Sequence, residues 1–211
     1  MGSDSEQRAV LFADLAGYTA LTEAHGDGHA ADVAGRFAVV AATALAPGAR
    51  VVKTIGDAVM IVAPDGRAGF ATALRLLRAV DDEPTFPGVR AGLEVGPIVE
   101  RGEDVFGATV NLAARLAAHA AVGKLVVASG VADLVTADDN VTVTAVGPTY
   151  LKNVGEPVDL FSIEDDFRTP RTQVMDPVCR MFVDGDDAAG SSAMGRPGLA
   201  VLLVRVRAGV Q

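Results

Sequence analysis

Two aspartates in this 211-residue chain stand where a predicted buried strand meets a turn. Asp14 ends the apolar run of FADLAGYT, and Asp57 lies at the turn of KTIGDAVM, between two apolar stretches. Carboxylates that meet at a buried edge repel one another unless a cation lies between them. Such oxygen ligands favour Mg²⁺ or Mn²⁺, which keep substrate phosphates as further ligands. The pair therefore predicts a divalent metal site that acts on a phosphate compound.

Each aspartate also has a simpler interpretation. Asp14 could be the N-cap of the following helix, and Gly56-Asp57 could be an ordinary hairpin turn. Taken singly, these interpretations are favoured. However, Gly17 follows Asp14 in a strand-to-helix turn, and the free N–H groups of such a turn are suited to a phosphate. The combination thus favours a site for a phosphorylated substrate.

A third polar group lies in the segment DVFGATVNLAARL, which contains Asp104, Asn111 and Arg115. Asn111 and Arg115 are four residues apart, so they share one face of a predicted helix that is otherwise rich in Ala and Leu. The alternative is a solvated helix face, because arginine is normally exposed. We interpret the two residues as candidates for polar contacts with a ligand.

The elements that must hold these residues alternate between strands and helices. This alternation predicts an α/β or α+β fold in which helices cover one face of a sheet. Thr19 and Glu23 offer cap chemistry for a helix that starts near Thr19. The predicted strands are 9–13, two around Gly56, two in 86–100 that are linked near 92–96, 124–129, 141–146 and 157–164. The predicted helices are 19 onward, 29–45, 66–80, 107–120 and 130–135.

Residues 8–164 resemble the catalytic domain of class III nucleotidyl cyclases. The matching segments are FADLAGYT, VVKTIGDAVM, GLEVGPIV, DVFGATVNLAARL and YLKNVGEPVDLFSI, in the order and spacing of that family. The resemblance implies an α+β sandwich with a ferredoxin-like βαββαβ core, its helices packed on a mainly antiparallel sheet. It also implies a catalytic domain at residues 8–166.

The resemblance implies a role for each matched residue. Asp14 and Asp57, with the carbonyl of Leu15, would hold two Mg²⁺ or Mn²⁺ ions. Lys53 and Asp104 would select the purine base, and this pair would favour ATP, because guanine presents the opposite hydrogen-bonding polarity. The remaining matches are Asn111 for the ribose, Arg115 for the α-phosphate, Lys152 for the phosphates, and Gly17, Tyr18 and Thr19 for substrate binding.

The implied reaction is the conversion of ATP to cyclic AMP and pyrophosphate. The family's sites lie between two catalytic domains, and one chain here carries both sets of residues, so a homodimer is expected. Two alternatives stay open: a catalytically silent domain that binds nucleotide and regulates a partner, and a guanylate cyclase. The full set of matched residues disfavours the first, and Lys53 with Asp104 disfavours the second.

Composition limits the other possibilities. With a net charge of −9, the chain lacks the excess of basic residues expected of a nucleic-acid-binding protein. The single cysteine, Cys179, forms no disulfide framework, and neither a signal peptide nor a membrane-spanning run is recognised, so a cytoplasmic protein is expected. The three histidines have no Cys or acidic partner at metal-ligand spacing, which disfavours a zinc site.

Composition changes after Asp166. Residues 167–174 are interpreted as a linker. The segment MDPVCRMFVDGDDAAG, which starts at Met175, resembles the opening of a YHS domain, but no second cysteine follows it. One thiolate does not make a metal site. Residues 175–211 are therefore interpreted as a truncated or frameshifted YHS-like tail that is expected to be poorly ordered.

Overall fold

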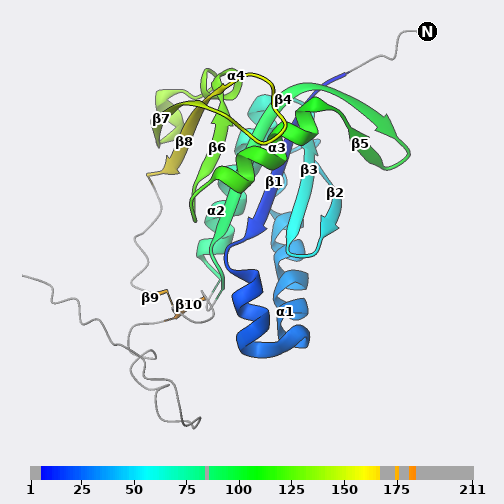
Figure 1. The fold of residues 1–211 in the computed structure, drawn as a ribbon, viewed down its shortest axis with the longest axis vertical. Helices are drawn as coiled ribbons and strands as arrows, with labels where there is room; N and C mark the ends of the chain where they lie inside the picture. Colours follow the sequence, from blue (N-terminus) through cyan, green and yellow to red (C-terminus); the bar gives the residue numbers. More distant parts are fainter. Residues whose placement is uncertain (1–5, 84–85, 167–173, 176–180, 184–211) are drawn as a thin grey trace, which may run out of the picture.

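The computed structural model describes residues 6–83, 86–166, 174–175 and 181–183 (Figure 1). Most of the chain forms one sheet with helices on it. The strands of this sheet are β1 (Glu6–Leu15), β2 (Arg50–Ile55), β3 (Ala58–Ala63), β4 (Val89–Arg101), β5 (Asp104–Phe106), β6 (Leu125–Ala128), β7 (Val141–Thr149) and β8 (Val158–Asp165). The helices are α1 (Tyr18–Thr43), α2 (Gly66–Asp81), α3 (Ala108–His119), α4 (Ser129–Ala132) and the 3₁₀ helix η1 (Ala137–Asp139).

The strand order is β2-β3-β1-β4-β6-β8-β7, and β5 pairs with β4. All neighbouring strands run antiparallel except β4 and β6, which are parallel. Within this sheet the elements β1-α1-β2-β3-α2-β4 give the strand order β2-β3-β1-β4, which is the ferredoxin-like arrangement. The predicted fold class, an α+β sandwich with a mainly antiparallel sheet, is confirmed.

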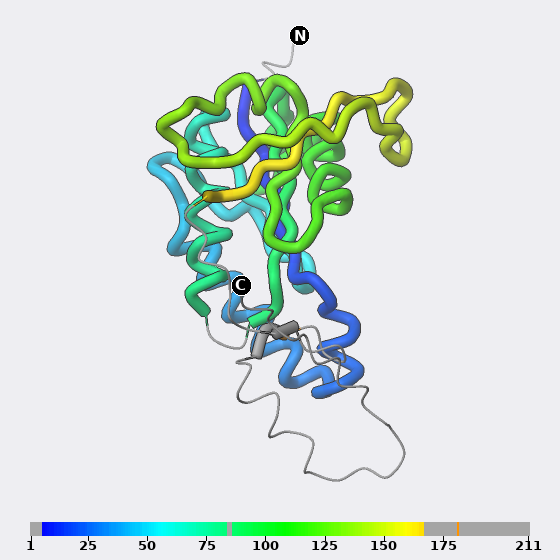
Figure 2. The backbone as a smooth tube through the Cα atoms, turned by 90° about the vertical axis from the view of Figure 1, so that its left-hand side faces the viewer, coloured from blue at the N-terminus to red at the C-terminus, as the bar shows by residue number. Residues whose placement is uncertain are grey.

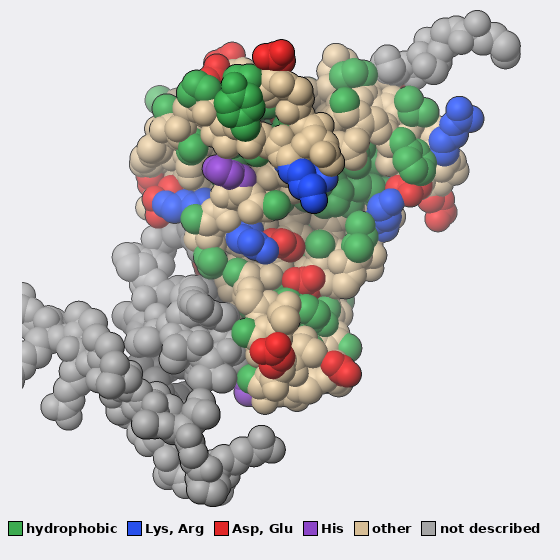
Figure 3. Space-filling view, viewed as in Figure 1, with side chains coloured by type: hydrophobic (Ala, Val, Ile, Leu, Met, Phe, Trp, Pro, Cys, Tyr) green, Lys and Arg blue, Asp and Glu red, His purple; other side chains and the backbone are tan. Residues whose placement is uncertain are grey.

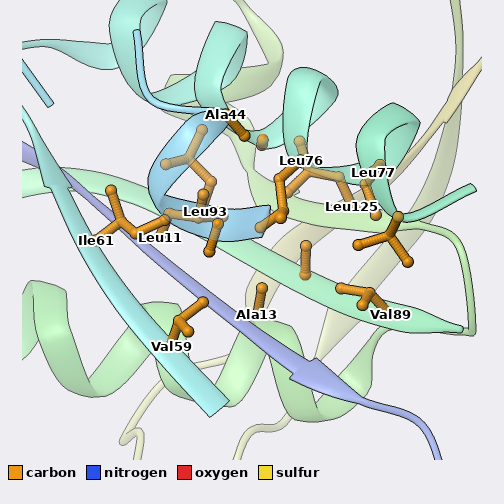
Figure 4. Packing of buried hydrophobic residues seen from close by; sticks show 14 of the residues in the cluster. Leu11, Ala13, Ala44, Val59, Ile61, Leu76, Leu77, Val89, Leu93 and Leu125 are labelled. Atoms are coloured by element: carbon orange, nitrogen blue, oxygen red, sulfur yellow. The ribbon is translucent and has the colours of Figure 1, made fainter. Parts of the chain in front are cut away.

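The main core lies between the sheet and helices α1 and α2. In β1 the side chains alternate, so that Leu11 and Ala13 face these helices while Val10 faces the other way. Figure 4 shows Leu11, Ala13 and Leu93 from the strands packed with Leu76 and Leu77 of α2. The N-cap of α2 is Asp65, whose carboxylate accepts the N–H of Ala68 at 2.8 Å. The buried apolar face of α2, which includes Leu76 and Leu77, holds the helix on the sheet.

Helices cover both faces of the sheet, and the prediction of a single covered face was wrong. Helix α3 crosses in front of the sheet in Figure 1, over β1 and β4. Its Ala113 is fully buried in a second cluster with Val10 and Met60, which point away from α1 and α2. The physical reason is that β1, β3 and β4 carry apolar side chains on both faces, so each face needs a cover.

Residues 89–101 form one long strand, β4, where the sequence predicts two strands linked near 92–96. The glycines do not make a turn there. A Cβ on Gly92 would lie 2.1 Å from the backbone nitrogen of Ala117, and one on Gly96 would lie 2.6 Å from Oγ1 of Thr109. Both glycines therefore let α3 approach the strand closely, which is a second common use of glycine inside a strand.

Replacing Gly92 by alanine should destabilise the protein by about 3 kcal/mol or more, because the new methyl group would overlap the backbone of α3. Gly35 is the matched control. It lies in α1, and a methyl group added there would meet no atom within 4 Å, so Gly35→Ala should stabilise by about 0.5 to 1 kcal/mol. Urea unfolding of both variants measures the difference. Equal stability of the two variants would show that α3 does not pack this closely.

Helix α1 begins at Tyr18, one residue before the predicted start, and the predicted side-chain cap is absent. The N-cap is Gly17, which has a left-handed φ of 81° and makes no side-chain cap hydrogen bond. Thr22 instead donates its hydroxyl to the Tyr18 carbonyl within the helix. The helical stretch predicted at 29–45 belongs to the same helix, which is interrupted at Gly26 with φ 83° and ψ 163°.

Two short strands, β9 (Val174–Met175) and β10 (Phe182–Val183), pair with each other. Met181 forms an isolated bridge with Pro87, and its side chain packs against the main core. The rest of the predicted linker and YHS-like tail lies outside the described residues, so those assignments stay predictions. None of the helices in the described ranges is both long and apolar enough to cross a membrane.

Candidate active site

Asp14 and Asp57 lie side by side at one end of the sheet. Asp14 is near the end of β1 and is the register partner of Ala58, the residue that follows Asp57. The backbone N–H of Leu15 donates to the carbonyl of Asp57 at 3.3 Å. Gly56 has a φ of 61°, which glycine adopts without strain, and it lets β2 turn directly into β3. The strand pairing therefore brings together two carboxylates that are 43 residues apart in sequence.

Arg90, which sequence analysis did not identify, completes this cluster. It lies opposite Asp14 in the β1–β4 pairing. Its Nε donates to Oδ1 of Asp14 at 3.0 Å and its Nη2 donates to Oδ2 at 2.9 Å. This is a bidentate pair that engages both carboxylate oxygens. The available sequence signal was one arginine within the otherwise apolar run VRAGL.

Electrostatics at this cluster favour more positive charge. Burial raises the pKa of Asp14, an effect that Arg90 opposes and that the nearby Asp57 reinforces. Burial also raises the pKa of Asp57, against a backbone hydrogen bond and the charge of Arg90. One positively charged guanidinium does not neutralise the negative charge of two carboxylates, so the two carboxylates fit a divalent cation. No cluster of three or more His, Cys, Asp or Glu side chains able to hold a metal occurs within the described ranges. Further ligands would have to be backbone or substrate oxygens.

Lys53 and Asp104 contact each other directly. Nζ of Lys53 lies 2.8 Å from Oδ1 and 2.7 Å from Oδ2 of Asp104, and both side chains are partly exposed. The hydrogen bond from Lys53, followed by one from the N–H of Val105, lowers the pKa of Asp104. The two residues come from different hairpins, Lys53 from β2 and Asp104 from β5. The predicted base-selecting residues are therefore brought together.

A β-bulge at Val52 controls the direction of Lys53. Val51 pairs with Ile61, but Lys53 pairs with Met60, so Val52 is the extra residue. Val52 packs on the same side of the sheet as Met60, and Val51 packs on the other. The bulge thus sets Lys53 opposite Met60 rather than over the main core. Lysine in that core would bear a large desolvation cost.

Asn111 and Arg115 lie on α3, where Asn111 is exposed and Arg115 is half-buried. Lys152 is exposed in the loop between β7 and β8, which projects from the body of the molecule (Figure 2). In the described part of the chain, no hydrogen bond or ion pair joins these three side chains to Asp14 or Asp57. One chain therefore brings together the two aspartates, and separately Lys53 with Asp104, but does not join them to α3.

The turn after Asp14 has mixed surroundings. Gly17 and Thr19 are exposed, whereas Tyr18 is half-buried and packs against the main core. Ala16 anchors the turn by donating its N–H to the Gly88 carbonyl at 2.7 Å. Acidic and basic side chains lie close together in the middle of the face seen in Figure 3. An exposed turn beside paired charges is the setting expected for a charged ligand.

The comparison with family models identifies this arrangement. Residues 3–165 match the adenylate and guanylate cyclase catalytic domain. The chain belongs to this family. Its cyclase domain therefore includes every element from β1 to β8, with the aspartates, the Lys53–Asp104 pair and α3.

Relatives that are named adenylate cyclases support the assignment. The cyclase domain is 37% identical over 162 residues to the pH-sensitive adenylate cyclase MT1302 of Mycobacterium tuberculosis, covering 75% of this chain and 41% of that protein. It is 42% identical over 108 residues to an adenylate cyclase of Streptomyces griseus, covering 51% of this chain and 27% of that protein. The chain thus spans less than half the length of these relatives.

Solved structures share the fold. An adenylate/guanylate cyclase/hydrolase structure from Silicibacter pomeroyi is 28% identical with a TM-score of 0.63, covering 77% of this chain and 99% of that one. The adenylyl cyclase CyaB from P. aeruginosa is 19% identical with a TM-score of 0.65, covering 81% and 98%. A Trypanosoma brucei adenylate cyclase is 21% identical with a TM-score of 0.67, covering 85% and 96%.

Glu94, a second residue that sequence analysis did not identify, is a half-buried acid of the cyclase domain. It lies in β4 opposite Val10, on the side of the sheet that α3 covers. Its Oε1 accepts the N–H of Val95 at 3.1 Å, while Oε2 is buried without a hydrogen-bond partner. Burial raises the pKa of Glu94 above the usual 4.5, and the hydrogen bond from Val95 only partly opposes this.

Because the folded-state pKa of Glu94 is raised, its effect on stability depends on pH with a defined sign. Its carboxyl group favours folding most below pH 4.5, and this contribution is lost as pH rises through the folded-state pKa. Glu94→Gln should therefore gain stability relative to the original protein as pH rises from 4 to 8. Urea unfolding of the metal-free proteins from pH 4 to 8 checks this. A difference that stays constant with pH would contradict it.

Proposed function

We propose that this cyclase domain is an adenylate cyclase that converts ATP to 3′,5′-cyclic AMP and pyrophosphate. The ribose 3′-oxygen bonds to the α-phosphorus, the bond from that phosphorus to the bridging oxygen of the β-phosphate breaks, and the hydroxyl proton is released. The attack is intramolecular, so catalysis consists mostly of alignment and charge stabilisation. The observation that carries the proposal is the pair of adjacent aspartates together with the Lys53–Asp104 contact in one cyclase domain.

The residues around Asp14 fit divalent ions. The carboxylates of Asp14 and Asp57 and the carbonyl of Leu15 would hold Mg²⁺ or Mn²⁺, two ions per site, as expected for hard oxygen ligands. When bound, such ions lower the pKa of the attacking hydroxyl and neutralise charge on the phosphates. Arg90 adds a guanidinium at the same place, next to where the triphosphate would lie.

Base selection is assigned to Lys53 and Asp104. Lysine donates to N1 of adenine and aspartate accepts from the 6-amino group, whereas guanine presents a donor and an acceptor at those positions in reverse. Lys53→Gln should lower the ratio of kcat/KM for ATP over GTP at least about tenfold, because glutamine can also accept from guanine. Competition assays with both nucleotides measure this ratio. An unchanged ratio would assign base selection to other residues.

The remaining roles are assigned across a homodimer. Asn111 would orient the ribose, Arg115 would stabilise charge on the α-phosphate, and Lys152 would contact the phosphates. The exposed or half-buried positions of these residues in one chain support a site completed by a second copy. A closed two-fold dimer would then contain two equivalent sites.

The deciding experiment measures cyclic nucleotide production by the purified full chain. ATP or GTP is supplied with Mn²⁺ and then with Mg²⁺, at several protein concentrations. Cyclic AMP from ATP, at a rate that rises faster than linearly with protein concentration, is the expected result. No product while the folded protein still binds ATP would favour a silent regulatory domain, and cyclic GTP as the main product would favour a guanylate cyclase.

A further inference from the structure

We infer that Arg90 is a built-in counter-cation of the metal site. A divalent ion must displace Arg90 from Asp14, and this displacement couples metal binding to nucleotide binding. This inference rests on the proposed function. It starts from the strand register, in which Asp14 lies between Ala58 on β3 and Arg90 on β4. Asp57 therefore approaches Asp14 from one side and Arg90 from the other.

The contact between Arg90 and Asp14 uses the atoms that a metal would need. Nε and Nη2 of Arg90 hold Oδ1 and Oδ2 of Asp14 at 3.0 and 2.9 Å, so both carboxylate oxygens already have a cationic partner. A metal ion bonded to either oxygen would have to share it with, or take it from, the guanidinium. Two cations on one carboxylate repel each other, so displacement is the favoured outcome.

Charge balance gives the same direction. Two ionised carboxylates and one guanidinium carry a net charge of −1, and exchange of the guanidinium for the first of the two divalent ions makes the group neutral. If both cations stayed, the net charge would be +1 in a partly buried site. The displaced guanidinium then needs a new anionic partner, and the triphosphate of the substrate is the one that arrives at this site.

The ion pair between Arg90 and Asp14 is weak enough for a metal ion to break it. The side chain of Asp14 is 26% exposed and that of Arg90 is 34% exposed, so the pair is partly screened by water. The counter-cation should therefore weaken metal binding without preventing it. Because linkage is reciprocal, a nucleotide that receives Arg90 should strengthen metal binding by the same factor as metal strengthens nucleotide binding.

The test uses the full chain, with Mn²⁺ alone as the first probe. Free Mn²⁺ is counted by electron paramagnetic resonance in the absence of nucleotide. Arg90→Gln should bind Mn²⁺ about tenfold more tightly than the original protein, and Arg75→Gln, an exposed arginine on α2, should not change the affinity. A non-reactive ATP analogue should strengthen Mn²⁺ binding to the original protein several-fold more than to Arg90→Gln. An equal or weaker Mn²⁺ affinity in Arg90→Gln would overturn the inference.

A measurement on the original protein does not depend on how the variant folds. The Nε–H signal of Arg90 is followed by ¹⁵N nuclear magnetic resonance during a titration with Mg²⁺. We expect the signal of the Nε–H bonded to Asp14 to be replaced by a different Nε–H signal as Mg²⁺ saturates the site. Persistence of the original signal at saturation would overturn the inference. Failure here is separable from failure of the proposed function, because cyclic AMP production at saturating metal does not require Arg90 to compete with the metal.

Discussion

Replacing Asp57 by asparagine should lower the rate of cyclic AMP formation at least about a thousandfold, because the metal site loses one of its two carboxylates. The folded protein should be preserved. Burial raises the pKa of Asp57, so the ionised side chain is unfavourable in the metal-free protein, and a neutral side chain of equal size removes that cost. The variant should therefore unfold at the same or a higher urea concentration while losing activity and Mn²⁺ binding.

Two controls make this prediction specific. Asp32→Asn removes an exposed carboxylate on α1 and should leave the rate within about twofold. Raising the Mn²⁺ concentration should not restore the Asp57→Asn variant, because a lost ligand is not replaced by mass action at a site that needs two carboxylates. A variant that retains more than a tenth of the original rate would remove Asp57 from the metal site.

Replacing Arg115 by alanine should lower kcat about 100- to 1,000-fold with little change in KM, because its guanidinium would stabilise charge that develops in the transition state. Arg115 is half-buried on α3 and makes no ion pair with another residue that the structure describes. Its removal should therefore cost little stability. Arg75→Ala, which removes an exposed arginine of α2, is the control and should keep the original kcat.

Mixing the two inactive variants tests the shared site directly. In an equal mixture of Asp57→Asn and Arg115→Ala, half of the dimers are mixed, and one of the two sites in each mixed dimer has both residues intact. About a quarter of the original activity should return if the sites are completed across a two-fold dimer. No recovery, while analytical ultracentrifugation shows that the subunits exchange, would place both residues in the same chain's site.

Local pattern was sufficient to predict much of the fold. The run KTIGD predicts a hairpin because apolar strands flank a glycine that can take a positive φ, and the structure has β2 and β3 there with Gly56 at 61°. The helical spacing of residues 66–80 predicts α2, which ends one residue later at Asp81. These elements depend on interactions between residues close in sequence, and those can be read from one segment at a time.

Two of the errors have a common cause in contacts between distant segments. Gly92 and Gly96 predict a turn, since glycine signals turns locally, but their role is to admit α3 against β4. The face covered by α3 could not be read from the helix itself, because both faces of β1 are apolar. Which of the two alternative uses of glycine applies depends on a helix that follows later in the chain.

The sequence alone determined the candidate chemistry of this protein. Asp14 and Asp57 predicted a divalent metal site for a phosphorylated substrate. The resemblance of five sequence segments predicted a cyclase domain, and family membership agrees. Only the tertiary structure decided which charges meet. Arg90 reaches Asp14, and Glu94 is left with an unpaired oxygen beneath α3, through strand pairing and burial. Electrostatic effects depend on distance and desolvation in space, and neither quantity can be read from spacing along the chain.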